Sequence, residues 1–140
     1  MSTSNNEISN KAGEYMIDTT PIPLLTKIQE KGRVWEDLAT QYGVTNPDPP
    51  WKITLETTCD LLAADSCVKP YEEVDTETCA LPSLERRAEE DELSETIYED
   101  VPFPERQLLA LAHSMIKRGL LNEDELESRM AEVEKRLNSA

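Results

Sequence analysis

The stretch "PFPERQLLALAHSMIKRGLLNEDELESRM", residues 102–130, predicts two helices joined by a short and well-specified turn. Prolines stand just before the first helix, where they are tolerated. Gly119 suits the left-handed residue that ends such a helix, and Asn122 is placed to cap the next one, with Glu125 as its capping-box partner. The apolar residues that mark one side of the first helix are Leu108, Leu109, Ala112, Met115 and Ile116.

The second helix, expected over about residues 123–137, has one apolar face and an opposite face of mixed charges. The apolar face consists of Leu126, Met130, Val133 and Leu137. Leu121, which precedes the cap, is placed to staple onto Leu126. A junction specified this closely indicates that the helices it joins are built to be buried against something.

Apolar residues at helical spacing also predict helices upstream of this junction. Three apolar faces are formed by Leu24, Leu25 and Ile28; by Val34, Trp35, Leu38 and Tyr42; and by Trp51, Leu55, Cys59 and Leu62. Gly32 separates the first two helices, the prolines of "TNPDPP" stop the second, and the third covers about 51–64. A weaker helix is expected at about 84–93. Because no stretch alternates apolar and polar residues as a strand does, the predicted fold class is all-α.

The composition indicates a thin hydrophobic core. Hydrophobic residues make up 38% of the chain, aromatic residues 5% and charged residues 31%. We divide the chain into a flexible N-terminal arm (1–20), short helices with a proline-rich connection (21–50) and a helical domain (51–140). We expect the arm to be followed by helical hairpins that are completed by packing on partner subunits.

The formal net charge of −15 excludes the usual electrostatic partners of basic proteins. Nucleic-acid phosphates and anionic membrane surfaces would both be repelled, so neither is expected as a partner. No apolar run has the length of a membrane span, and the first thirty residues lack the features of a signal peptide. We therefore predict a cytoplasmic protein.

The residues that most often carry metal or catalytic chemistry do not form a recognisable site. His113 lies inside a helical pattern, and since no orienting carboxylate or nucleophile is marked for it, a structural or surface role is favoured over that of a general acid or base. Cys59, Cys67 and Cys79 match no zinc or cluster spacing and are expected to be reduced. Cys59 should pack in the core, and the other two are candidates for exposed thiols.

Arg86 and Arg87 form a cationic pair inside the acidic segment "LERRAEEDE". One interpretation is pairing within the helix, such as Arg86 with Glu89 or Glu90. The other is that a guanidinium is offered to an anionic group on a partner, for which its planar fork is well suited. The sequence leaves both interpretations open.

The C-terminal third, "ETIYEDVPFPERQLLALAHSMIKRGLLNEDELESRMAEVEKRL", resembles the end of the helical N-terminal domain of nitrile hydratase β subunits. The family pattern is "YxxxPYYxxWLxxxxxxxxxKGxIxxxELxxR", and related residues stand here at Tyr98, Pro102, Phe103, Leu108, Gly119, Leu121, Glu125, Leu126 and Arg129. Upstream, "PPWKITLETTCDLLAADSCVKPYEEV" resembles the preceding unit of the family, and the thiocyanate hydrolase β subunit is the most similar form. The resemblance covers roughly residues 51–137.

This resemblance implies that the metal chemistry belongs to another chain. A metal-binding α-type subunit with a "CxxCSC" claw would hold cobalt(III) or iron(III), a separate subunit would form the β-barrel, and the substrate would be a small nitrile or thiocyanate. The present chain would bind no metal or other cofactor. By the same resemblance, Arg86 and Arg87 are the candidates for contacting the claw, and Tyr98 and Phe103 are the candidates for lining the substrate pocket.

Three functions follow as hypotheses. The favoured one is a helical subunit of a heteromeric hydratase of the nitrile hydratase or thiocyanate hydrolase type, inactive alone, that packs on the metal-bearing subunit. The alternative is an activator or metallochaperone that assists insertion of cobalt or iron. The third is a small acidic helical adaptor unrelated to hydratases.

Overall fold

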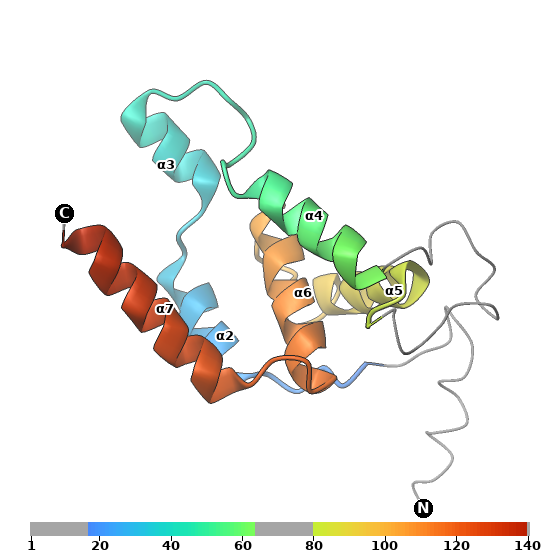
Figure 1. Cartoon of the computed structure of the whole chain (residues 1–140). Coiled ribbons are helices and arrows are strands. Elements are labelled where there is room, and N and C mark those ends of the chain that lie inside the picture. The colour runs from blue at the N-terminus through green and yellow to red at the C-terminus, as the bar shows by residue number, and fades with distance from the viewer. Residues whose placement is uncertain (1–16, 64–79, 140) are drawn as a thin grey trace, which may run out of the picture.

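The structure, a computed structural model, describes residues 17–63 and 80–139. These residues form six helices and no strand (Figure 1), which confirms the all-α prediction. The helices are α2 (Pro23–Lys31), α3 (Trp35–Tyr42), α4 (Lys52–Ala63), α5 (Ser83–Ser94), α6 (Glu105–Lys117) and α7 (Glu123–Asn138). Cys67, Cys79 and most of the predicted N-terminal arm lie outside the described residues.

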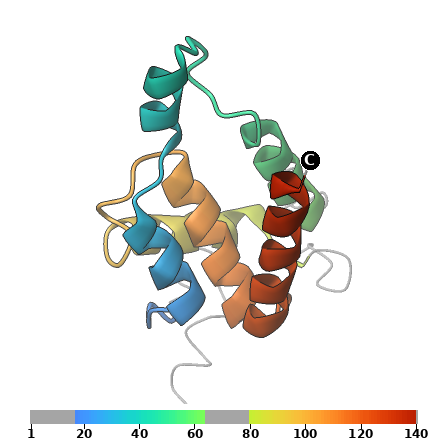
Figure 2. The same ribbon diagram turned by 90° about the vertical axis from the view of Figure 1, so that its left-hand side faces the viewer.

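Helix α6 is the centre of the packing. Helix α5 crosses it and makes the most extensive helix–helix contact, while α2 lies against another side of α6 (Figure 2). One hydrophobic cluster consists of Ile17, Ile22, Leu25, Leu93, Tyr98, Val101, Leu109 and Ala110. A second cluster consists of Leu55, Cys59, Leu81 and Leu111 and joins α4 to the other side of α6. The prediction that Cys59 packs in the core is confirmed.

The first cluster draws on all three parts into which the sequence divides the chain. Ile17 belongs to the range predicted as the arm, Leu25 to the range of short helices and Leu93 to the C-terminal domain. All three side chains are buried together. The first cluster therefore spans the predicted boundaries.

The apolar stripe predicted on α6 describes the buried surface of this helix only in part. Leu109 is buried as expected, but Leu108 is 42% exposed, whereas Leu111 and His113 are buried outside the predicted stripe. The physical reason is that α6 is enclosed on more than one side, so no single face defines its burial. Leu108 and Met115 instead line an open surface that is described below.

Two carboxylates of α5 are buried against the cation that follows α6. Arg118 Nη2 donates to Glu85 Oε1 at 2.7 Å and also to Glu89 Oε2. Burying a carboxylate costs several kcal/mol unless a cation and hydrogen bonds compensate it. The contacts of Arg118 with these two carboxylates therefore fix the end of α6 on α5.

His113 is a fully buried core residue that joins α6 to the start of the described chain. Its Nδ1 accepts a hydrogen bond from Tyr98 Oη at 2.9 Å, and its Nε2–H donates to the backbone carbonyl of Asp18 at 2.8 Å. Since a carbonyl only accepts, Nε2 carries a proton, and in the neutral ring Nδ1 then accepts from the Tyr98 hydroxyl. Burial lowers the pKa of His113, which favours the same neutral form. These contacts agree with the structural role favoured by the sequence.

The first turns of α2 and α3 are capped by carboxylates from distant helices. Neither Ile22 nor Val34, the residues at the two cap positions, provides a side-chain hydrogen bond. Instead, Glu123 Oε2 accepts from Leu24 N–H at 2.9 Å, and Glu105 Oε2 accepts from the first amide of α3. An acidic group is favourable at the positive end of a helix. These caps place the start of α7 beside α2.

Candidate partner-binding groove

The junction between α6 and α7 has the local structure that its sequence predicts. Gly119 has a φ of 77°, in the left-handed region, and Asn122 Oδ1 accepts from Glu125 N–H at 2.9 Å. Beyond this turn, α7 begins beside α2 and extends to the C-terminal end of the chain (Figure 1). Lys27 Nζ donates to Glu127 Oε2 at 3.0 Å, so polar contacts hold the first turns of α7.

The apolar face of α7 is exposed. Among the described residues of α7 none is buried, and Met130, Val133 and Leu137 are 40%, 41% and 70% exposed. The expectation that this helix is buried against something is therefore not met within the described part of the chain. Its amphipathic pattern is typical of a helix that packs against another surface, and the described residues do not cover this face.

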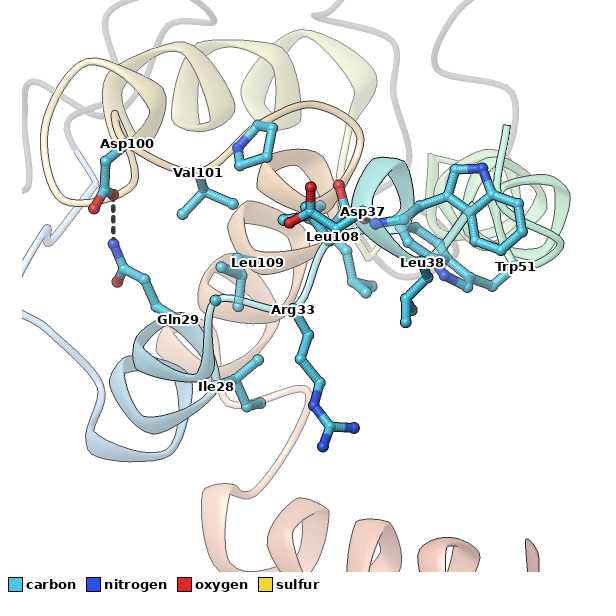
Figure 3. Close-up of a pocket in the computed structure, with 15 residues that line it drawn as sticks. Ile28, Gln29, Arg33, Asp37, Leu38, Trp51, Asp100, Val101, Leu108 and Leu109 are labelled. Atoms are coloured by element: carbon cyan, nitrogen blue, oxygen red, sulfur yellow. Dashed lines mark hydrogen bonds between the residues drawn. The ribbon is translucent and has the colours of Figure 1, made fainter. Parts of the chain in front are cut away.

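Three adjoining cavities separate this face from the rest of the molecule, and we call them together the open groove. The largest, about 690 Å³, lies along α7. One of about 550 Å³ lies between α2, α3 and α6 (Figure 3), and one of about 350 Å³ lies between α4 and α6. The cavities adjoin one another, since each pair shares at least one lining residue: Arg33, Leu126, or Trp51 and Leu108.

The walls of the open groove are mostly apolar. In the part shown in Figure 3, Ile28, Val101 and Leu109 form one end, and the Trp51 ring lies at the other. Arg33 extends from the connection between α2 and α3 and also lines the cavity along α7. Within residues 17–63 and 80–139, no group of three or more His, Cys, Asp or Glu side chains is placed to hold a metal ion. Such a surface fits an apolar helix face better than a charged small molecule.

A second exposed apolar surface lies on the side of α4 opposite its buried residues. Ile53 and Leu61 are both 75% exposed and stand eight residues apart on one side of the helix. We call this surface the α4 outer face. The backbone amide of Leu81 donates to the carbonyl of Leu62 at 3.0 Å, which places the end of α4 beside the start of α5. Leu84 in the first turn of α5 is also exposed.

The two candidate arginines of α5 have different environments. Arg86 Nη1 donates to Glu90 Oε1 at 3.0 Å, which is the pairing within the helix that the sequence left open. Burial raises the pKa of the Glu90 carboxyl, and Arg86 opposes this shift. Arg87 is exposed. Of the two, Arg87 is the more accessible to another molecule.

The two candidate pocket-lining residues do not lie together. Tyr98 is buried in the core, and its hydroxyl is bonded to His113. Phe103 is 55% exposed beside Pro104, where it lines a shallow cavity of about 300 Å³ together with Trp35. The structure therefore places Arg87, Tyr98 and Phe103 in separate environments.

Most apolar residues of the open groove are predicted from the sequence as parts of helix faces, but Arg33 is not predicted there. The available signal was its position directly after Gly32, where a connection between two helices exposes a long cationic side chain. Comparisons with protein-family models, with curated proteins and with solved structures found no match. In the described part of the chain, no helix has the length and apolarity needed to cross a membrane.

Proposed function

We propose that this chain is a helical binding subunit that works only in complex with other chains, in an enzyme of the nitrile hydratase or thiocyanate hydrolase type. The observation that carries the proposal is the exposure of large apolar side chains, Ile53 and Leu61 on α4 and Leu84 on α5. Extended exposed apolar surfaces of this kind mark protein interaction sites, because leaving them in water is unfavourable. A partner that covers them accounts for the thin core of the isolated chain.

The resemblance of roughly residues 51–137 to hydratase β subunits supports a metal-bearing chain as that partner. We assign the contact to the α4 outer face, with Arg87 of α5 directed to the oxidised cysteines of the partner's claw. A guanidinium forms strong charge-assisted hydrogen bonds with such oxygens. Arg87 is preferred to Arg86 because Arg86 is already paired with Glu90. Phe103 is preferred to Tyr98 for lining the substrate pocket because only Phe103 is exposed.

In this proposal the present chain supplies surface and positioning, and the partner supplies the chemistry. Cobalt(III) or iron(III) in the partner would act as a Lewis acid toward the C≡N group or would activate the nucleophile. A separate β-barrel chain would complete the enzyme. The isolated chain is expected to show no turnover, and its cytoplasmic location stays a prediction.

Co-expression with a claw-bearing chain tests the proposal. We expect the two chains to co-purify in a fixed ratio with metal bound, and Leu61→Asp on the α4 outer face to reduce the recovered complex about tenfold or more. Gln41→Asp, on an exposed position of α3, adds the same charge elsewhere and should leave recovery unchanged. Recovery of fully active, metal-loaded enzyme without this chain would contradict the proposal, and substoichiometric association would identify the activator alternative instead.

A further inference from the structure

The exposed face of α7 has the spacing of a coiled-coil seam. Leu126, Met130, Val133 and Leu137 are separated by four, three and four residues. This places Leu126 and Val133 at the d positions of a heptad and Met130 and Leu137 at the a positions. All but Leu126, which is half-buried at the edge of the open groove, are exposed.

The charged residues that flank this seam carry opposite signs on its two sides. Arg129 and Arg136 occupy the g positions, and Glu127 and Glu134 occupy the e positions. In two parallel helices a g residue of one faces the e residue five positions later in the other, whereas in antiparallel helices g faces g and e faces e. Charges at these positions set the orientation and the choice of partner.

We propose that α7 of a second copy of this chain packs in parallel against the exposed apolar face of α7. In that register Arg129 of each copy faces Glu134 of the other, which gives two attractive pairs by symmetry. The antiparallel arrangement sets arginine against arginine and glutamate against glutamate. Within its own helix Arg129 meets only a distant and exposed acceptor, Glu132 Oε1 at 3.7 Å, which does not compete strongly with such a pair.

The seam is short, so the proposed dimer is weak. Two heptads form only a marginal coiled coil on their own, which places the expected dissociation constant in the micromolar range. Pairing along the cavity beside α7 would remove Met130, Val133 and Leu137 of both copies from water. The inference goes beyond the proposed function, because it uses the apolar face of α7 and not the α4 outer face, and it holds whether or not the metal-bearing partner exists.

Reversal of the flanking charges tests the proposed register. Sedimentation equilibrium of the full chain should give a dimer at tens of micromolar. Arg129→Glu and Glu134→Arg should each raise the dissociation constant about tenfold, because each turns two attractive pairs into repulsive ones. The double variant should restore the wild-type value to within about threefold, since it exchanges the two partners. Lys135→Glu, which makes the same change of charge as Arg129→Glu on the outer f position, is the matched control and should have little effect.

Cross-linking tests the parallel direction independently. In a chain with Cys67→Ser and Cys79→Ser, Met130→Cys should form a disulfide with its counterpart on mild oxidation, because equal a positions meet only in parallel helices. Ser128→Cys, on the outer f position, is the control and should not form one.

A wild-type chain that is monomeric at about 200 micromolar would overturn the inference. So would a failure of the double variant to recover association, an effect of Lys135→Glu as large as that of Arg129→Glu, or equal cross-linking at positions 128 and 130. Because the measurements use this chain alone, they are decided independently of co-purification with a metal-bearing chain.

Discussion

Helices α6 and α7 are neighbours in the chain, and both carry apolar residues at helical spacing. In the structure, however, α6 is largely buried and α7 is exposed. Helix α6 buries five of its residues: Leu109, Ala110, Leu111, His113 and Ser114. Helix α7 is longer and buries none within the described chain. Amphipathic spacing therefore predicts which face of a helix is suited to packing, but it does not show whether the same chain covers that face.

The free energy of folding should be distributed in the same unequal way. Around α6, apolar packing and the buried contacts of Arg118 and His113 act together. The first turns of α7 are held by Glu123 and by the pair of Lys27 with Glu127, which is exposed and contributes little. We call the helices packed around α6 the body. In the chain alone, we expect the body to unfold cooperatively and α7 to detach from it at a lower cost in free energy.

The largest expected difference comes from truncating one leucine in each region. Leu93→Ala removes a fully buried side chain and should lower the free energy of unfolding by about 2 to 5 kcal/mol. Leu137→Ala, on the exposed face of α7, should lower it by less than about 0.5 kcal/mol. Urea denaturation at low protein concentration, where self-association is absent, measures both. Equal losses would show that α7 packs on the body as firmly as α5 does.

The buried histidine should make the free energy of unfolding of the body depend on pH. The pKa of His113 is lowered from its ordinary value of 6.5, so below that pH the unfolded chain binds more protons than the folded one. The stability that the neutral ring contributes is present above about pH 6.5 and is lost as the pH falls through the lower folded pKa. Unfolding measured between pH 7.5 and 5 should show this decline, and His113→Gln should remove it.

Asp18 provides an internal check on that experiment. Hydrogen bonds from Thr20, followed by the contact with Lys117, lower the pKa of Asp18 from 3.8 to about 2. The stability that the ionised Asp18 carboxylate contributes is therefore present above about pH 3.8, and it is lost as the pH falls from there toward about 2. A decline between pH 7.5 and 5 that persists in the His113→Gln variant would mean that other groups cause it.

The smallest expected effect is at the cap of α7. Asn122→Ala removes the acceptor for Glu125 N–H and should destabilise α7 by about 1 kcal/mol. Because α7 is not buried, hydrogen exchange should accelerate in its first turns while the urea midpoint of the body stays nearly constant. Asn122→Asp keeps an acceptor and should exchange like the wild type. A shift of the whole transition in Asn122→Ala would show that α7 and the body unfold together.

Local signals predicted the helices well. The weak helix expected at about 84–93 is present as Ser83–Ser94, and the predicted left-handed Gly119 and capping Asn122 both occur. These features depend on residues a few positions apart, so the sequence contains all the groups involved. The interfaces of α6 were not predictable in this way, because its apolar residues surround most of the helix and periodicity could not assign them to neighbours.

Contacts between distant residues account for most of what the sequence did not reveal. Nothing in the local pattern assigns Glu89 to Arg118 or Glu105 to the start of α3, because each pair is set by the packing of whole helices. The same holds for the candidate site. Trp51, Leu108 and Leu126 were each predicted on an apolar face, but that these faces border one open groove follows only from the arrangement of the helices.

The bond between Glu123 and Leu24 connects α7 to α2. A carboxylate ninety-nine residues away supplies the acceptor that the start of α2 lacks. The Leu24 amide is therefore a natural spectroscopic reporter of where α7 stands. A displacement of α7 by any molecule that enters between the helices would change the hydrogen bonding of that single N–H, far from the point of entry.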